Sequence, residues 1–150
     1  MVQPIKQKKM NIIRINIFLF FLTFVCWAQA TNKSPLKTDI TIVKNQQWYL
    51  QTLKKNKYLA NDNQPYICFS DTQLSGFAGC NQIKGNYTIK NNHIDIQNIK
   101  QTKKFCQESI KTENIFLELL HKTHKWTLRK NKFILKDEHN KKLLIFTNQQ

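Results

Sequence analysis

The sequence predicts a mainly β domain of the α+β class. We expect a small antiparallel curled sheet or open barrel of seven or eight strands with one helix packed on it. Short runs that alternate apolar and polar residues dominate from Trp48 onward, and Asn, Asp, Gly and Lys separate them. A single later stretch has helical spacing, and all three glycines fall within ten residues. These observations favour β structure with one sharply bent strand region.

The expected strands alternate along most of the chain. Trp48 and Leu50 share one face of the first strand, and Pro65 fits only at the start or edge of the second. The Asn91–Asn92 pair predicts a short hairpin turn, and Asn131 and Asn140 mark later turns. We expect strands at residues 48–53, 65–70, 73–77, 84–90, 93–99, 125–129, 132–136 and 143–147.

Residues 108–122 break the period of two. Phe116, Leu117 and Leu120 follow the spacing of one helix face. Thr112 is a candidate N-cap, and Glu113 lies next to the positive end of the helix dipole. This stretch predicts the single helix.

The glycine-rich segment contains Gly76, Gly79 and Gly85, with Cys80 and Asn81 between them. Glycine is used where the backbone takes positive φ or another group approaches closely. A phosphate-binding loop leads into a helix N-terminus, whereas this segment leads into a strand. We therefore expect a sharp strand bend at a barrel corner, with Asn81 bonded to the local backbone.

The N-terminus resembles a secretory signal peptide. Four basic residues precede an apolar run over 17–27, and Ala28-Gln29-Ala30 follows as a cleavage site. The run is too short to span a bilayer. We expect a signal peptide at 1–30 starting from Met1 or Met10, a linker at 31–46 and a domain at 47–147, in a periplasmic or secreted protein. A retained N-terminal anchor, or acylation of Cys26, is the alternative.

The chain is strongly basic. It carries 24 Lys and Arg against 9 Asp and Glu, a net charge of +15. Because the predicted leader holds four basic and no acidic residues, the mature chain carries +11. Such a surface attracts lipopolysaccharide, acidic lipids or polyanions, although a merely solvated lysine-rich surface also fits. No nucleic-acid motif is present, so that partner class is not expected.

Three cysteines follow the leader: Cys68, Cys80 and Cys106. An exported chain of this kind predicts one disulfide and one leftover thiol. Loop entropy gives about 2.9, 3.5 and 3.9 kcal/mol for the pairs 68–80, 80–106 and 68–106, so it does not choose among them. Three reduced core cysteines remain an alternative. Cys68 alternates with Ile67 and Phe69, which suggests a small buried hydrophobe.

The order of these features resembles the META domain family, which includes HslJ-like heat-shock proteins. Its Trp-x-Leu opening, G-x-x-G-C-N segment with a later G-x-Y, T-x-x-x-C segment and helix with F-L-x-x-L all recur over residues 47–146. Where relatives often have Arg-Met-Ala, this chain has residues 103–105 as Lys-Lys-Phe. The matching signature residues are Trp48, Gly76, Gly79, Cys80, Asn81, Gly85, Tyr87, Thr102, Cys106 and Glu113.

The resemblance carries several expectations. It implies a disulfide between Cys80 and Cys106, since each ends a signature segment. It also implies a small envelope protein linked to heat shock, stress or antibiotic tolerance, without a defined mechanism. Many relatives are lipoproteins, and here only Cys26 could play that part.

Catalytic and metal chemistry are not predicted. His121 and His124 form an isolated pair without metal-ligand spacing. A Cys80 nucleophile would need a base such as His93 or His121, and no catalytic signature surrounds any of them. We expect a non-enzymatic monomer without cofactors that binds an anionic envelope component or another envelope protein. The alternative is a secreted interaction module, such as a hydrolase inhibitor or a secretion accessory protein.

Overall fold

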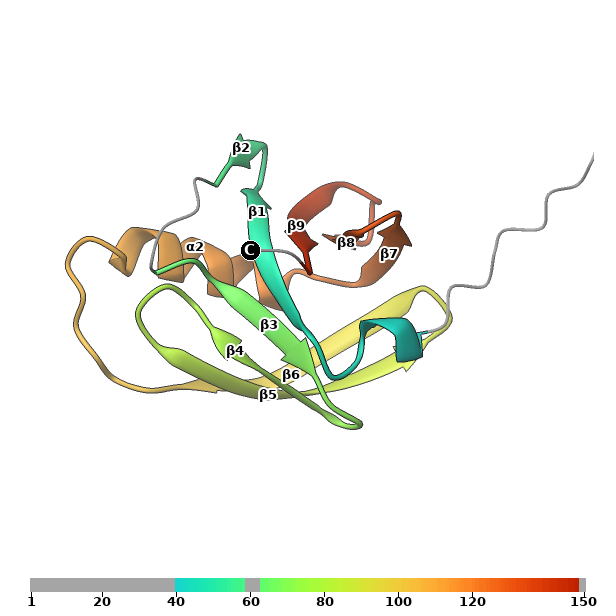
Figure 1. Cartoon of the computed structure of the whole chain (residues 1–150), viewed down its shortest axis with the longest axis horizontal. Helices are drawn as coiled ribbons and strands as arrows, with labels where there is room; N and C mark the ends of the chain where they lie inside the picture. The colour runs from blue at the N-terminus through green and yellow to red at the C-terminus, as the bar shows by residue number, and fades with distance from the viewer. Residues whose placement is uncertain (1–39, 59–62, 149–150) are drawn as a thin grey trace, which may run out of the picture. The chain divides into compact units, whose positions relative to one another are not determined.

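The structure is a computed structural model that describes residues 40–58 and 63–148 (Figure 1). All of these residues belong to one compact unit. The predicted signal peptide at 1–30 lies outside the described residues. The elements are η2 (Ile40–Val43), β1 (Gln47–Leu53), β2 (Asn56–Lys57), β3 (Tyr66–Phe69), β4 (Gln73–Phe77), β5 (Gln82–Lys90), β6 (His93–Gln101), α2 (Ile110–His121), β7 (Lys125–Arg129), β8 (Lys132–Lys136) and β9 (Lys142–Thr147).

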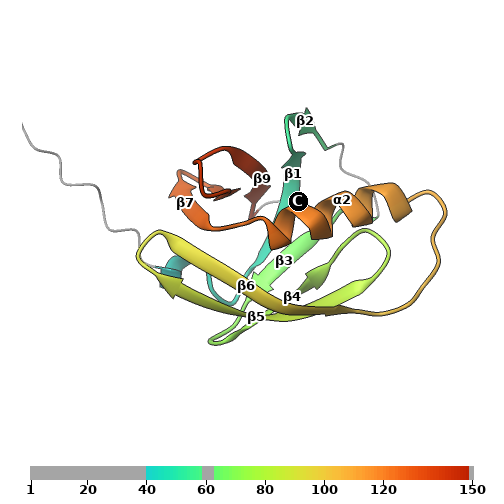
Figure 2. The same cartoon turned by 180° about the vertical axis from the view of Figure 1, so that it is seen from behind.

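The strands form one curled antiparallel sheet. Their order is β2-β1-β3-β4-β5-β6-β7-β8-β9, and an additional β1–β9 pairing closes the sheet into a ring. The ring is not a regular barrel, because β6 and β7 share a single register pair, His93 with Lys125. α2 contacts both β6 and β9, and its C-terminal end leads directly into β7 (Figure 2). The predicted fold class is confirmed, with the two-residue β2 as an additional strand.

The core fills the ring with aromatic side chains. Phe133 is fully buried, and its ring centroid lies 5.5 Å from those of Trp48 and Phe69 and 5.9 Å from that of Trp126. The Trp48 indole donates to the carbonyl of Val43 at 2.9 Å, which satisfies its buried N–H. Trp48 and Leu50 share the inner face, as the alternation predicts.

Residues 40–46, expected to belong to a linker, pack onto the domain. Val43 in η2 is fully buried, and Lys44 forms a parallel bridge with Phe69. Val43 supplies one apolar side chain and one acceptor to the core, and Ile40 packs against the same core. In the part of the chain that the structure describes, no helix is both long and apolar enough to cross a membrane.

The glycine-rich segment is a strand, a turn and a strand, and only Gly79 has positive φ. Gly76 lies within β4, where an added Cβ would stand 2.3 Å from the Tyr66 carbonyl oxygen. Gly79 has φ of 105° in the β4–β5 turn. The predicted single bend is therefore corrected: close strand approach, rather than bending, requires glycine at position 76.

The helix begins earlier than its predicted cap. Ser109 occupies the N-cap position without a side-chain cap hydrogen bond, and Thr112 lies inside the first turn. Thr112 as the cap is thus wrong, because the backbone already turns at Cys106, whose carbonyl accepts from the N–H groups of Ser109 and Ile110. Glu113 lies in the first turn, as expected.

Candidate functional site

A disulfide joins Cys80 in the β4–β5 turn to Cys106 in the loop before α2, with 5.9 Å between their Cα atoms. This is the pair that the family resemblance implies. The bond ties the sheet to the segment that leads into the helix. We call Cys80, Asn81, Thr102, Cys106 and Glu113 the clasp.

Asn81 is the centre of the clasp. Its Oδ1 accepts from the Thr102 hydroxyl at 2.7 Å and from the Lys104 N–H at 2.8 Å. Its Nδ2 donates to Glu113 Oε1 at 2.8 Å and to the Lys104 carbonyl at 3.1 Å. All four hydrogen-bonding positions of this side chain are therefore occupied.

Glu113 is 5% exposed and faces Asn81 from the first turn of α2. Its Oε2 accepts the Asn81 backbone N–H at 2.8 Å, beside the bond from Nδ2 to Oε1. The helix N-terminus favours this buried carboxylate. The prediction that Asn81 bonds the local backbone is wrong, because its side-chain partners come from positions 102, 104 and 113. Such a saturated cluster holds the fold together and has no free group for a ligand.

The other signature residues are also structural. Trp48 is in the core, and the Tyr87 hydroxyl donates to the Ser70 carbonyl. Burial raises the pKa of Tyr87 above its ordinary value. At Gly85 an added Cβ would lie 3.0 Å from the Gln97 carbonyl oxygen, next to a register shift between β5 and β6.

Cys68 is half-buried on the outer face of β3, so its prediction as a buried hydrophobe is wrong. Ile67 and Phe69 take the inward positions of the two-residue period. Partial burial raises the pKa of the Cys68 thiol. All four histidines are exposed, and Cys80 is a half-cystine rather than a thiol. Among the residues described, no three His, Cys, Asp or Glu gather as a metal site would require.

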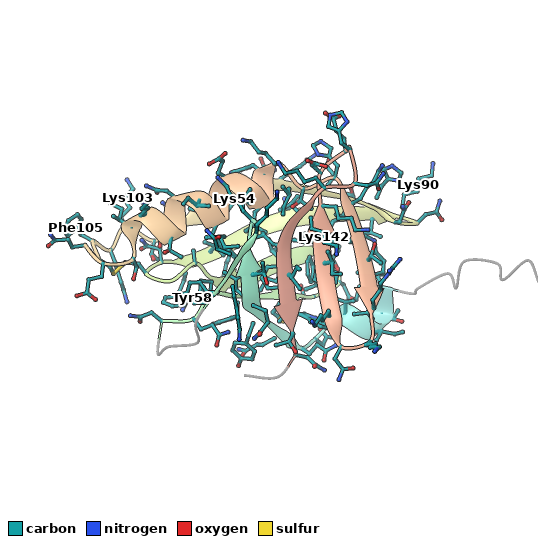
Figure 3. All side chains as sticks on the ribbon, turned by 90° about the horizontal axis from the view of Figure 1, so that it is seen from above. Lys54, Tyr58, Lys90, Lys103, Phe105 and Lys142 are labelled. Carbon is teal, nitrogen blue, oxygen red and sulfur yellow. A yellow bond between two sulfur atoms is a disulfide. The ribbon has the colours of Figure 1, made fainter. Side chains whose placement is uncertain are left out.

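A groove of about 1090 Å³ lies between α2, the β1–β2 turn and the β8–β9 turn. Leu119, Leu143 and Ile145 give it an apolar part. Figure 3 labels Lys54 beside α2 and Lys142 beside β9, on two sides of this region. The lysines that line the groove are Lys54, Lys55, Lys122, Lys141 and Lys142. We call it the basic groove.

Three carboxylates also line the basic groove, and nearby groups occupy them. Glu118 pairs with Lys122, and the pKa of Glu118 is lowered first by the hydrogen bond from Lys122 and then by the charges of Lys122 and Lys54. Glu138 lies 3.3 Å from the His139 ring. Asp137 Oδ1 accepts the backbone N–H of Lys141 at 2.8 Å. Within residues 40–58 and 63–148, no carboxylate pairs with Lys54, Lys55, Lys141 or Lys142.

Lys142, which lines the basic groove, belongs to a row of three lysines on neighbouring strands. Lys125, Lys136 and Lys142 lie opposite one another in the register of β7, β8 and β9. Like charges directly opposite on neighbouring strands repel. Burial lowers the pKa of Lys136, and the charges of Arg129, Lys142 and Lys125 lower it further. We call Lys125, Lys136 and Lys142 the lysine row.

The sequence shows these lysines spread along the chain, and the fold brings them together. The β1–β2 turn contributes Lys54 and Lys55, which lie about 90 residues before Lys141 and Lys142. Part of the pattern is readable in advance, because a tight turn at 130–131 places Lys125 opposite Lys136. The position of Lys142 depends on a register shift at Leu135/Lys136, which no local pattern announces.

The family model of the META domain matches residues 40–150. The chain belongs to the META domain family. An NMR structure of a protein from Burkholderia xenovorans superposes with a TM-score of 0.59 at 15% identity, covering 81% of this chain and 98% of that one. A second NMR structure gives a TM-score of 0.60 at 18% identity, over 74% and 95%.

A crystal structure of a DUF4847 family protein from Bacteroides vulgatus gives a TM-score of 0.52 at 17% identity, over 74% of this chain and 99% of that one. At these identities the likeness shows the fold of this META domain and nothing of its ligand. No curated protein matches the chain significantly.

Proposed function

We propose that this META protein is a non-enzymatic, exported binding protein of the cell envelope whose basic groove takes an anionic ligand with an apolar part. The lysine row carries this proposal. Three like charges held opposite one another cost stability, and a folded domain retains such a cost where an anion offsets it. Burial is the main cause of the lowered pKa of Lys136, and the same crowding of positive charge lowers that pKa further.

The shape of the basic groove supports the choice of ligand. Its volume of about 1090 Å³ exceeds the size typical of small-molecule pockets, so it suits a segment of a larger molecule. Leu143 and Ile145 favour an apolar portion, while Lys54 and Lys142 favour phosphate or carboxylate groups. An amphiphilic anion of the envelope combines both.

Binding of lipopolysaccharide and of dextran sulfate tests the proposal. Both are anionic, and only lipopolysaccharide has acyl chains for the apolar part. We expect lipopolysaccharide to bind more tightly per charge, and both affinities to fall as salt rises from about 50 to about 300 mM. Lys142→Glu should lower both affinities, by roughly fivefold to tenfold for a reversal of one close charge.

Lys90→Glu is the matched control, because Lys90 is exposed at the far end of β5 and the change in net charge is the same (Figure 3). If both variants lost equal affinity, the groove would not be the site and net charge alone would explain binding. Complete absence of salt-sensitive binding would remove the proposal.

The proposal also includes export, which the signal-like N-terminus supports. It includes a link to stress or antibiotic tolerance, which the family resemblance supports. A non-reducing peptide map of the protein isolated from its cells tests export. We expect an N-terminus at Thr31 and a cystine peptide that joins Cys80 to Cys106. A lipid on Cys26 would instead establish a tethered lipoprotein, and an intact N-terminus at Met1 or Met10 would contradict cleavage.

A further inference from the structure

We propose that the loop before α2 is a membrane-docking tip, in which Phe105 inserts between the headgroups of an anionic bilayer while neighbouring lysines contact lipid phosphates. This surface is separate from the basic groove. Figure 3 shows Phe105 and Lys103 at the end of the domain where α2 begins, away from Lys54 and Lys142. The proposal therefore stands independently of the ligand assigned to the groove.

The exposure of Phe105 is the first observation. Its side chain is 80% exposed, more than any other large hydrophobic residue described, and Ile110 nearby is 45% exposed. Both residues line one small pocket of about 340 Å³, so they lie on the same surface. A single exposed apolar residue is ordinary, but an aromatic ring and an isoleucine together form an apolar point that water solvates poorly.

The second observation is that the clasp fixes the backbone on both sides of Phe105. The Asn81 side chain bonds both the N–H and the carbonyl of Lys104, and Cys106 is held by the disulfide. The loop therefore cannot fold its backbone inward to cover the ring. A site ordered before binding loses less conformational entropy when its partner arrives.

The charge around the tip indicates which kind of partner it binds. Lys103 and Lys104 directly precede Phe105, and Lys111 directly follows Ile110. Glu108 is the one exposed acid within this stretch, and Glu113 is buried and bonded within the clasp. An exposed aromatic ring among lysines matches the interface of an anionic membrane, where rings lie at headgroup depth and lysines meet phosphate. It does not match a neutral apolar protein surface.

Vesicles of phosphatidylglycerol and phosphatidylcholine provide the test, with the chain as isolated after expression and its N-terminus read by mass spectrometry. We expect Phe105→Ala to bind anionic vesicles about tenfold more weakly, and Lys103→Gln and Lys104→Gln to lose about fivefold each. Ile42→Ala is the apolar control, because Ile42 is 58% exposed in η2. Lys90→Gln is the charge control, and both controls should bind as the unchanged chain does.

A depth measurement locates the insertion whatever other segment touches the vesicle. In a Trp27→Phe background, the indole introduced by Phe105→Trp should shift its emission to the blue and be quenched by brominated lipids in anionic vesicles. Trp48 and Trp126 are buried and provide the constant background. Absence of both the quenching and the Phe105→Ala effect would overturn the proposal.

The proposals for the basic groove and for the docking tip can be contradicted independently of each other. Binding of soluble dextran sulfate should respond to Lys142→Glu and remain unchanged in Phe105→Ala. If Phe105→Ala weakened dextran sulfate and vesicle binding equally, the ring would support the fold or the groove rather than insert into lipid, and the docking tip would be wrong.

Discussion

The clasp and the basic groove lie at different parts of the META domain and differ in whether their polar groups have partners. In the clasp, Asn81 makes every hydrogen bond its side chain can make, and the buried Glu113 carboxylate receives two of its bonds from Asn81. Around the groove, Lys136 faces Lys125 and Lys142 without a carboxylate between them. The first arrangement serves stability. In the second, Lys125 donates to the Glu138 carbonyl and to Asn140 Oδ1, while Lys136 and Lys142 have no carboxylate partner among the described residues, and we propose that they are available to a ligand.

This contrast separates the residues that identify the family from the residues that we propose to bind a ligand. The signature residues cluster in the clasp and the core, where substitution should destabilise the fold. The groove lysines are absent from that signature, and their substitution should change binding while the fold remains. The predictions below test this division, beginning with the largest expected effect.

Loss of the disulfide should have the largest effect on stability. The bond spans a sequence separation of 26, and loop entropy for this length gives about 3.5 kcal/mol. We expect Cys106→Ser to lower the free energy of unfolding by about that amount in urea titrations. Cys68→Ser is the matched control and should cost less than about 1 kcal/mol. Equal losses in the two variants would indicate that the disulfide adds nothing.

Asn81→Ala should be nearly as damaging. It removes the side-chain bonds to Thr102, Lys104 and Glu113, and it leaves the buried Glu113 carboxylate with fewer donors. Leaving a buried charged acceptor partly unsatisfied costs on the order of 3 kcal/mol. Asn114→Ala, at an exposed asparagine of α2, is the control and should be nearly neutral. A small effect of Asn81→Ala would show that water replaces the lost bonds.

Lys142→Glu should act in the opposite direction on stability. Replacing one member of the lysine row by a carboxylate converts repulsion of Lys136 into attraction, worth about 0.5 kcal/mol in a cross-strand pair. We expect a small rise in the thermal midpoint together with the weaker anion binding proposed above. A variant that lost both binding and stability would place Lys142 in the fold rather than in the site.

The smallest effect concerns pH. The pKa of Glu118 is lowered by Lys122 and Lys54, so the folded state favours the carboxylate. Its contribution to stability is present above the unfolded pKa and is lost as pH falls through the lower folded value. The difference in free energy of unfolding between the unchanged chain and Glu118→Gln should therefore shrink as pH falls from about 6 to about 3. Added salt should reduce the difference, because the pair is exposed. A difference that grew toward acid would reverse the assigned sign.

Local patterns made most strands predictable. Lys125–Arg129 and Lys132–Lys136 match their predicted bounds, because two alternating runs separated by a short turn have one natural pairing. β2 was missed, since two polar residues at Asn56–Lys57 carry no period. The buried Val43 was missed because the run Ile40-Thr41-Ile42-Val43 is short and has neither the period of a strand nor the length of a helix.

The sites were less predictable than the strands. The Cys80–Cys106 bond followed from the family signature rather than from loop length, which favoured no pair. The partners of Asn81 were wrong because hydrogen bonds across 20 or more residues leave no local spacing. The basic groove depends on bringing Lys54 next to Lys142, and only the closed β1–β9 pairing does that.

That β1–β9 pairing also sets the order in which the chain can finish folding. β1 is the first strand of the sheet along the sequence and β9 is the last, so the ring cannot close until residues 142–147 have formed their strand. Until then β1 and β8 each expose an open edge, and contacts of such long sequence separation form slowly. The ring of this domain therefore closes only after its final strand, residues 142–147, has been made.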